Sequence, residues 1–542
     1  MRSETATVLA WLDQLPDELV RDRPPLCVFQ AWALLISGRP LTTVEERLEE
    51  AARCEAEGQD RTAPVRALLA LYAGHITRAV ELSSWSLEHL LPDDLFLRNL
   101  ATSIVSLSHL LDGDLASSAS ALEQAARKSR KAGNVMLAVP LLCHVGSLRM
   151  RQGRLHQAQD IYQQALSWAT DPTGSLLPIA GEALMGLGRL SFEWNDLHAA
   201  ARHLIEGIQL TGQWSEVGAM DGYISLAHLR RAEGDFAAAQ EAIDQARDLA
   251  LQTDVTDLDD ILVEAHQAQL WVAQGNVDAA RDWLEVRGLL PRDSGAAPPK
   301  LSLAEHRIPA EPSVPSQAVE PALSKSEGPA IGVALGELET RISDDKIVSQ
   351  QRRTAEYTTL VRVLLACGHT REALAVLQPL LSIAQRWGLN ERVIRFQILR
   401  AVAFGAQGDE SKAADALDRA LSLAEPAGYV RPFLDEGAAM QRLLYSATRR
   451  PDAAEYAGRL LVAFPAEDSA SQERLVDLVE PLSARELDVL RLISDGLSNQ
   501  AIADRLFISL ATVKWHTTNI YGKLGVHNRT QAVARARTLD LL

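Results

Sequence analysis

The sequence of 542 residues contains few cysteines, and their positions exclude most cysteine chemistry. Cys27, Cys54, Cys143 and Cys367 lie far apart in apolar helical contexts, so no two of them have the spacing of metal ligands. Four cysteines in so long a chain also do not form a disulfide framework. We therefore expect buried free thiols in a reducing cytosol.

Long apolar segments are absent as well. No apolar run reaches about 18 residues, so we expect no membrane span. The first residues, MRSETATVLAWLDQLPDELV, include acidic side chains and no apolar core, which excludes a secretory signal peptide. The sequence predicts a cytoplasmic protein without a membrane partner.

Positive charge is scarce over most of the chain. The net charge of −17 argues against a protein that coats nucleic acid or anionic membrane with its whole surface. Residues 481–542 differ, because they hold eight Lys/Arg against five Asp/Glu, a net charge of +3. The sign of the charge changes at the C-terminus.

Catalytic motifs are also missing from the sequence. It contains no nucleophile elbow, no metal-ligand cluster and no glycine-rich turn between a strand and a helix. His516 stands next to Trp515 without a second ligand at metal-binding spacing. We expect no enzyme activity, no cofactor and no metal site.

Helix-ending residues recur at intervals near 40 residues. The series is Gly38, Gly74, Gly113, Gly153, Asn195, Gly234, Gly275, Gly368 and Gly408, and its one long interval is 93 residues. Glycine, and less easily asparagine, adopts the left-handed conformation that ends a helix. The next residue is often an aspartate suited to capping a second helix: Asp114, Asp196, Asp235 and Asp409. The pattern predicts about nine stacked helix pairs.

Small and apolar residues follow the turns at offsets of 5, 9 and 12, which lie on one helical face. Three examples are Ala158, Tyr162 and Ala165; Ala239, Ile243 and Ala246; and Ala413, Leu417 and Ala420. This face resembles that of the tetratricopeptide repeat, although the period is longer. The resemblance implies an all-α superhelix with a concave groove, whose ligand would be a peptide, another domain or a small molecule.

Proline divides the chain into segments. Residues 291–330 hold eight of the 23 prolines, so we expect a largely disordered insertion over 291–346. The predicted domains are helical repeats over 1–290, further repeats and closing helices over 347–465, and a linker over 466–478. A separate module is expected over 479–542.

The last 60 residues predict a compact module of four helices. Ser483 and Glu486 form a capping box for the first helix, and Gly496 ends it. Ser498, Ser509 and Thr530 are the N-caps expected for the other three helices. In the third helix, Val513, Thr517, Ile520 and Leu524 form the stripe expected to be buried, with His516 at its edge, whereas Lys514, Trp515 and Thr518 lie on the opposite face.

The motifs of this module resemble the LuxR-type DNA-binding domain. They are Leu482-Ser-Ala-Arg-Glu486, Gly496-Leu-Ser-Asn-Gln-Ala-Ile-Ala503, Ile508-Ser-Leu-Ala-Thr-Val-Lys-Trp-His516 and Asn519-Ile-Tyr-Gly-Lys-Leu524. The resemblance implies a four-helix helix-turn-helix domain that places its third helix in the major groove of double-stranded DNA. It departs from the family at Trp515, where small residues are usual, and at Thr518, where a basic residue is frequent. An alternative for Trp515 is packing against a neighbouring domain.

The resemblance also implies roles for individual residues. Those expected to face base edges are Lys514, Trp515 and Thr518. Those expected to contact the DNA backbone or to orient the helix are Ser498, Asn499, Ser509, Thr512, His516, Asn519 and Lys523. The fourth helix is expected to form a homodimer on DNA through Thr530, Val533, Ala534, Arg537 and Leu541.

Helical repeats followed by a LuxR-type domain resemble the large MalT-like regulators. Those regulators carry an ATPase domain ahead of the repeats, whereas this sequence has no phosphate loop, and its only Gly-Lys pair is Gly522-Lys523. The chain is then a shortened version, a fragment, or one half of a two-protein switch. The resemblance implies a sequence-specific transcriptional regulator whose repeats sense a ligand or partner in their groove. The alternative is an interaction scaffold of the tetratricopeptide type that does not bind DNA.

Overall fold

The computed structural model describes most of the repeats and part of the C-terminal module. The described residues are 9, 11–12, 14–15, 20, 23–36, 39, 41–54, 60–72, 75–91, 93–111, 114–252, 257–290, 347–450, 453–464, 484–494, 496–506, 510, 513–514, 516–517, 520–521, 526, 529 and 531–533. They contain helices and no strand; one isolated bridge joins Thr170 and Leu176. The all-α prediction is confirmed. None of the helices described is both long and apolar enough to cross a membrane.

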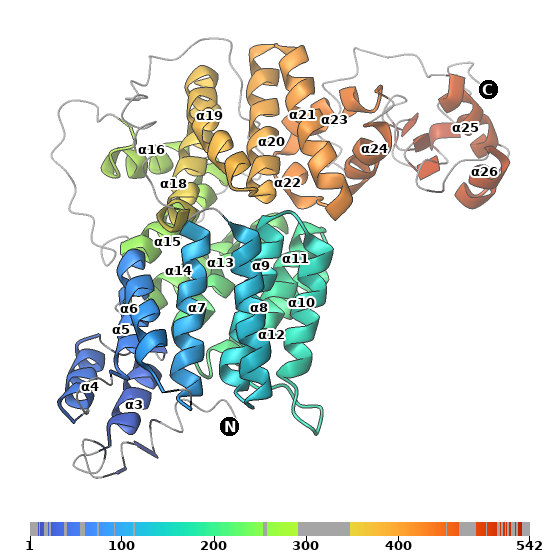
Figure 1. Ribbon diagram of the computed structural model, residues 1–542. Helices are drawn as coiled ribbons and strands as arrows, with labels where there is room; N and C mark the ends of the chain where they lie inside the picture. Colours follow the sequence, from blue (N-terminus) through green and yellow to red (C-terminus); the bar gives the residue numbers. More distant parts are fainter. Residues whose placement is uncertain are drawn as a thin grey trace. The chain divides into compact units, whose positions relative to one another are not determined.

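Antiparallel helix pairs follow one another along the described chain (Figure 1). The pairs are α3 (Pro24–Ile36) with α4 (Leu41–Cys54), α5 (Ala63–Tyr72) with α6 (Ile76–His89), α7 (Leu95–Leu111) with α8 (Leu115–Lys131), α9 (Val135–Arg151) with α10 (Leu155–Trp168), α11 (Ala180–Glu193) with α12 (Leu197–Thr211), α13 (Glu216–Ala232) with α14 (Phe236–Gln252), α15 (Asp257–Ala273) with α16 (Val277–Val286), α18 (Ile347–Ala366) with α19 (Thr370–Arg386), and α20 (Asn390–Gln407) with α21 (Glu410–Ala424). Each first helix from α9 to α15 also packs against the next first helix. The repeat prediction is therefore confirmed for these segments.

The turns within the pairs have the predicted conformation. Gly153, Gly234, Gly275, Gly368 and Gly408 have positive φ angles. The one non-glycine residue of the described chain with a positive φ is Asn195, at 63°. All four predicted aspartate caps accept a backbone N–H three residues ahead, at 2.9–3.1 Å. The first three turns of the predicted series, Gly38, Gly74 and Gly113, lie outside the described residues.

The small face predicted for the second helices is buried. Alanines at offsets 5 and 12 are fully inaccessible: Ala158, Ala165, Ala239, Ala246, Ala413 and Ala420. The larger residues between them, Tyr162, Ile243 and Leu417, are at most 1% exposed. Because these alanines occupy little space, the paired helices approach closely and bury the larger side chain between them.

The helix stack continues across the proline-rich segment. Helix α15 packs against α18, and the Thr359 hydroxyl donates a hydrogen bond to the Ala265 carbonyl, at 3.3 Å. Arg287, just after α16, forms an ion pair with the buried Glu356 of α18, at 2.9 Å. The repeat therefore resumes at α18. Residues 291–346, for which we predicted a disordered insertion, lie outside the described residues.

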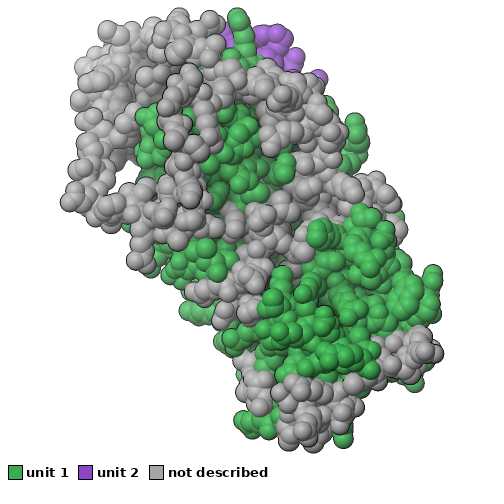
Figure 2. All heavy atoms as spheres, turned by 90° about the vertical axis from the view of Figure 1, so that its left-hand side faces the viewer, with its two compact units in different colours: residues 1–396 green, residues 397–542 purple. Residues whose placement is uncertain are grey.

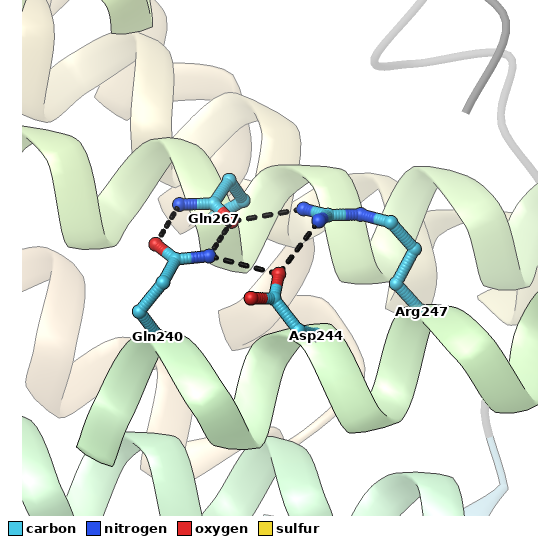
Figure 3. Close-up of polar contacts among 4 residues, drawn as sticks. All are labelled: Gln240, Asp244, Arg247 and Gln267. Atoms are coloured by element: carbon cyan, nitrogen blue, oxygen red, sulfur yellow. Dashed lines mark hydrogen bonds and ion pairs between the residues drawn. The ribbon is translucent and has the colours of Figure 1, made fainter. Parts of the chain in front are cut away.

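A polar network fixes the register of α14 against α15 (Figure 3). The amides of Gln240 and Gln267 exchange two hydrogen bonds of 2.7 and 2.8 Å. Arg247 donates to the Gln267 oxygen and to Asp244, both at 2.8 Å. Gln267 is only 3% exposed, so its amide needs these partners.

The chain divides into two compact units, residues 1–396 and 397–542, coloured separately in Figure 2. The second unit contains the rest of α20, then α21, η2 (Glu425–Ala427), α22 (Arg431–Leu434), α23 (Gly437–Ala447) and α24 (Ala454–Ala463). The hydroxyl of Tyr456 donates to the Tyr429 carbonyl, and its ring packs edge-on against the buried Phe433. These helices occupy the segment in which we predicted closing helices.

The three cysteines whose side chains the structure describes form no disulfide, and the Cys27 thiol donates to the Val20 carbonyl at 3.1 Å. Cys27 and Cys143 are buried, as expected, whereas Cys367, which follows the last residue of α18, is only partly buried. The side chain of Cys54 lies outside the described residues.

Candidate nucleic-acid interface

The C-terminal module has its own apolar core. Helices α25 (Ala484–Ser494) and α26 (Asn499–Leu506) pack around it. The buried residues are Val489, Leu490, Ile493, Ile502, Ala503, Val513, Ile520 and Ala532. Members of this set come from all four predicted helical segments, so the segments share one core.

The turn between α25 and α26 has the predicted chemistry. Gly496 ends α25 with a φ of 85°, and the Ser498 hydroxyl accepts the Ala501 N–H at 3.2 Å. The expected capping box lies outside the described residues at Ser483, and nothing is described of the Glu486 side chain. The short turn and the cap fix where α26 begins relative to α25.

The third segment shows the predicted division into a buried and an exposed side at the positions that are described. Val513 and Ile520 are fully buried and Thr517 is 8% exposed, with its hydroxyl donating to the Val513 carbonyl at 2.8 Å. Lys514 is exposed. The other two residues predicted to read bases, Trp515 and Thr518, lie outside the described residues, as does Leu524 of the predicted stripe.

The residues predicted to contact the DNA backbone fall into three groups. Ser498 is exposed and Asn499 is partly exposed at the start of α26, and the N-terminus of a helix favours phosphate. His516 is only 8% exposed, so its ring belongs mainly to the edge of the core. Ser509, Thr512, Asn519 and Lys523 lie outside the described residues.

The predicted dimer helix is described over residues 531–533 only. Val533 is partly buried against the module's own core, next to the fully buried Ala532. One face of this helix therefore holds the module together. Thr530, Ala534, Arg537 and Leu541, which we predicted for the dimer contact, lie outside the described residues.

Arg529 has a structural role that sequence reasoning missed. Its guanidinium donates to the Ile493 carbonyl at 2.7 Å and so satisfies an end carbonyl of α25. Burial raises the pKa of the nearby Tyr521 hydroxyl, and the positive charge of Arg529 opposes that rise. A lone arginine after a glycine-rich stretch gives no sequence signal for this contact.

The described residues contain no cluster of three or more His, Cys, Asp or Glu side chains that could hold a metal ion. The module has a small helical core, an exposed lysine on its third segment and an exposed serine, Ser498, at the start of α26. This combination defines a helical-repeat protein that ends in a helix-turn-helix module.

Comparison with known proteins identifies the family. The model described as "MalT-like TPR region" matches residues 60–297 and 325–450, and the model described as "Bacterial regulatory proteins, luxR family" matches residues 480–536. The chain belongs to the MalT-like TPR family and carries a luxR-family module at its C-terminus. These matches support a DNA-binding transcriptional regulator rather than an enzyme class.

Curated relatives cover nearly the whole chain. The HTH-type transcriptional regulator MalT of Serratia proteamaculans (strain 568) is 25% identical over 566 residues, which is 99% of this chain and 56% of the relative. MalT of Yersinia pestis (strain Pestoides F) is 24% identical over 570 residues, with the same coverage. The chain thus spans about half the length of these relatives. A solved structure of a Rap protein complexed with Competence and Sporulation Factor has 11% identity and a TM-score of 0.47, and covers 75% of this chain and 99% of its own.

Proposed function

We propose that this protein is a sequence-specific DNA-binding regulator of transcription whose repeat region controls its C-terminal module. One observation carries the proposal: the third segment of the module buries Val513 and Ile520 and leaves Lys514 exposed. A helix held by its apolar side, with an accessible basic residue on the other, is suited to the major groove. The luxR-family match over the same residues supports this assignment.

In the proposed complex, Lys514, Trp515 and Thr518 face base edges. Ser498, Asn499, Ser509, Thr512, Asn519 and Lys523 contact phosphates, and His516 orients the third helix from the edge of the core. The fourth helix pairs two protomers through the side not occupied by Ala532 and Val533. Two protomers then read two half-sites of a promoter.

The repeat region acts as the sensor in this proposal. An effector bound by the superhelix shifts the population between a form that restrains the module and a form that binds DNA. The comparison that tests restraint is the DNA affinity of the intact protein against that of residues 479–542. Tighter binding by the isolated module supports restraint, and equal or weaker binding contradicts it. We place the protein in the cytoplasm, where promoter DNA is reached.

The DNA-binding proposal is tested on the full chain. Genomic fragments retained by the purified protein are sequenced, and the affinity for the recovered site is measured by fluorescence anisotropy. The double variant Lys514→Ala/Thr518→Ala should bind this site roughly 10- to 100-fold more weakly, because contacts to base edges are lost.

The control is Lys131→Ala, which removes the same charge from the exposed end of α8 and should leave the affinity unchanged. Circular dichroism confirms that each variant is folded. If the wild-type protein retains no specific fragment, the proposal is wrong, and the helical repeats favour an interaction scaffold instead.

A further inference from the structure

The first helices of six successive repeats form a closed ring. In chain order, α7, α9, α11, α13, α15 and α18 each pack against the next member of the series, and α18 also packs against α7. In a simple stack of helical repeats, each repeat contacts only its neighbours in the chain. The contact between α18 and α7 joins the first and last members of the series, so the stack has completed a full turn.

Because the ring is closed, the start of the following first helix, α20, returns to helices from much earlier in the chain. Arg395 of α20 forms an ion pair with Glu193 at the end of α11, 202 residues away in the sequence, and a second ion pair with Glu391 of its own helix, at 2.8 Å. The turn after α9 lies against the same helix start, since a Cβ built on Gly153 would be 3.1 Å from the Cβ of Asn390. The start of α20 thus rests on the ends of α9 and α11.

This contact differs in chemistry from the contacts within the helix pairs. The pairs bury alanine faces, whereas the ion pair joins two charged side chains, of which Glu193 is 10% exposed and Arg395 is 32% exposed. Water can solvate both charged groups after separation, but separating two alanine faces would expose apolar surface. Arg395 also keeps Glu391 as a partner when Glu193 moves away, because the two lie four residues apart on one helix. The contact can therefore open while the helix pairs stay intact.

Helix α20 belongs to both compact units. It runs from Asn390 to Gln407, and the boundary between the units falls after Phe396. The residues that contact α9 and α11 lie in its first two turns, whereas its remaining turns belong to the unit that contains the C-terminal module. A continuous helix transmits movement as a rigid element. Holding or releasing the first turns of α20 therefore restrains or frees the start of the second unit.

We propose that Glu193, Glu391 and Arg395 form a latch that holds α20 on the ring, and that release of this latch is the step through which the repeats control the C-terminal module. With the latch closed, the second unit is restrained and DNA binding is weak. With the latch open, the module is free to bind DNA, and an effector acts by shifting the population between the two forms. This inference rests on the proposed function and names the residues that carry its regulation.

Loss of the latch should strengthen DNA binding. Arg395→Gln and Glu193→Gln, each in the full-length protein, should raise the affinity for the recovered promoter site at least fivefold, because allosteric couplings are typically about 5- to 150-fold. Fluorescence anisotropy measures the affinity. The matched control is Arg287→Gln, which breaks an ion pair of similar burial with Glu356 between neighbouring repeats and should leave the affinity unchanged. If the two latch variants bind DNA no more tightly than this control, the latch does not regulate the module.

A disulfide tests whether closing the latch again reverses that effect. In Gly153→Cys/Asn390→Cys the two Cβ atoms lie close to the separation of about 3.5–4.5 Å found in disulfides. Combined with Arg395→Gln, the oxidised protein should bind DNA as weakly as the wild type, and reduction should restore the tighter binding. The wild type with the same oxidant is the control for the native cysteines. A native protein that forms no disulfide, or a disulfide that leaves the affinity unchanged, contradicts the latch. If the cysteine variant does not fold, the two single latch variants and their control still decide.

The latch and the DNA-binding proposal fail separately. Small-angle X-ray scattering reports on the latch without DNA: the radius of gyration of the Arg395→Gln variant with the cysteine pair should fall on oxidation, because the second unit is held again. A fall without specific DNA binding by the wild type refutes the regulator and leaves the latch standing. Specific DNA binding that neither the latch variants nor the disulfide changes refutes only the latch.

Discussion

Tyr162 shows how single residues set the spacing of the helices. Its side chain is fully buried, and its ring lies between Gly146 of α9 and Gly186 of α11. A Cβ at these glycines would come within 2.7 and 2.3 Å of ring atoms, closer than carbon atoms pack. The ring therefore fits only because both neighbouring first helices have no side chain at this point.

Gly186→Ala should destabilise the protein by roughly 1–3 kcal/mol, the usual cost of overpacking a tight core. Chemical denaturation at pH 7 measures the loss. In a double-mutant cycle with Tyr162→Leu the two changes should be strongly non-additive, since the smaller side chain leaves room for the methyl group. Additive effects would show that the alanine acts through something other than this ring.

Glu182 predicts a pH dependence of stability. Burial raises the pKa of this carboxyl to about 7, with Arg189 opposing and Asp221 adding to the rise. Between its unfolded pKa, near 4.3, and pH 7, the folded state holds a proton that the unfolded state has lost, so stability falls as the pH rises through this window.

Glu182→Gln removes that dependence. Relative to the wild type, the variant should gain stability progressively between about pH 5 and pH 7, reaching on the order of 2 kcal/mol above pH 7. Urea denaturation at a series of pH values measures the difference. A difference that stays constant from pH 4.5 to pH 7.5 would show that the carboxyl titrates normally.

At the scale of the helical element, Asn195 tests what ends a repeat helix. It occupies a position where the sequence series otherwise has glycine, and its φ of 63° lies in the left-handed region. Asn195→Ala should cost about 1 kcal/mol, because a Cβ without a polar side chain tolerates this conformation poorly. Asn195→Gly should be neutral or slightly stabilising. Thermal melts distinguish the two, and equal effects would mean that φ is not what selects asparagine here.

The amide pair between α14 and α15 gives a second test at this scale. Gln267→Ala removes both hydrogen bonds between Gln267 and the partly buried Gln240 amide and should cost roughly 1–3 kcal/mol. Gln240→Leu/Gln267→Leu removes both amides at similar size and should cost less than the single change. If the double variant lost as much stability as the two single leucine variants combined, the hydrogen bonds between the two amides would not explain the contact.

The sequence predicts some elements better than others. Turns such as Gly153 and caps such as Asp196 follow from backbone geometry that few residue types can adopt, so their identity is a reliable signal. The buried alanine positions of the second helices are also predictable, because close packing of two helices leaves room only for small side chains. One shared polar position was missed: Arg189, His228, Gln269 and Arg362 each lie six residues before the turn residue of their own pair, but they do not share a residue type. Only a search by position and polarity, rather than by identity, would have found it.

The candidate DNA interface shows the same limit. The helical period correctly placed Val513 and Ile520 inside and Lys514 outside, because burial follows a 3.6-residue repeat. The period left His516 at the edge of the stripe, and the structure puts it almost wholly inside. Arg529 could not be found at all, since its contact with the Ile493 carbonyl depends on how the fourth segment returns to α25.

At the scale of the whole molecule, charge is separated along the chain. Residues 481–542 of the C-terminal module carry +3 within a protein of net charge −17. An acidic repeat region disfavours non-specific contact with DNA, so binding depends on the few cations of the module. Each phosphate contact then adds a fixed amount to the slope of log K against log salt concentration.

The number of protomers bound can be measured through Lys523, which in our proposal contacts a phosphate. The slope of log K against log salt changes by about 0.9 for each phosphate contact that is lost. Lys523→Ala should therefore reduce the slope by about 0.9 if one protomer binds and by about 1.8 if two bind, and we expect the larger value. Anisotropy titrations of the specific site at several salt concentrations give the slopes, with Lys131→Ala as the charge-matched control. An unchanged slope would remove Lys523 from the interface, and a change near 0.9 would mean that a single protomer reads the site.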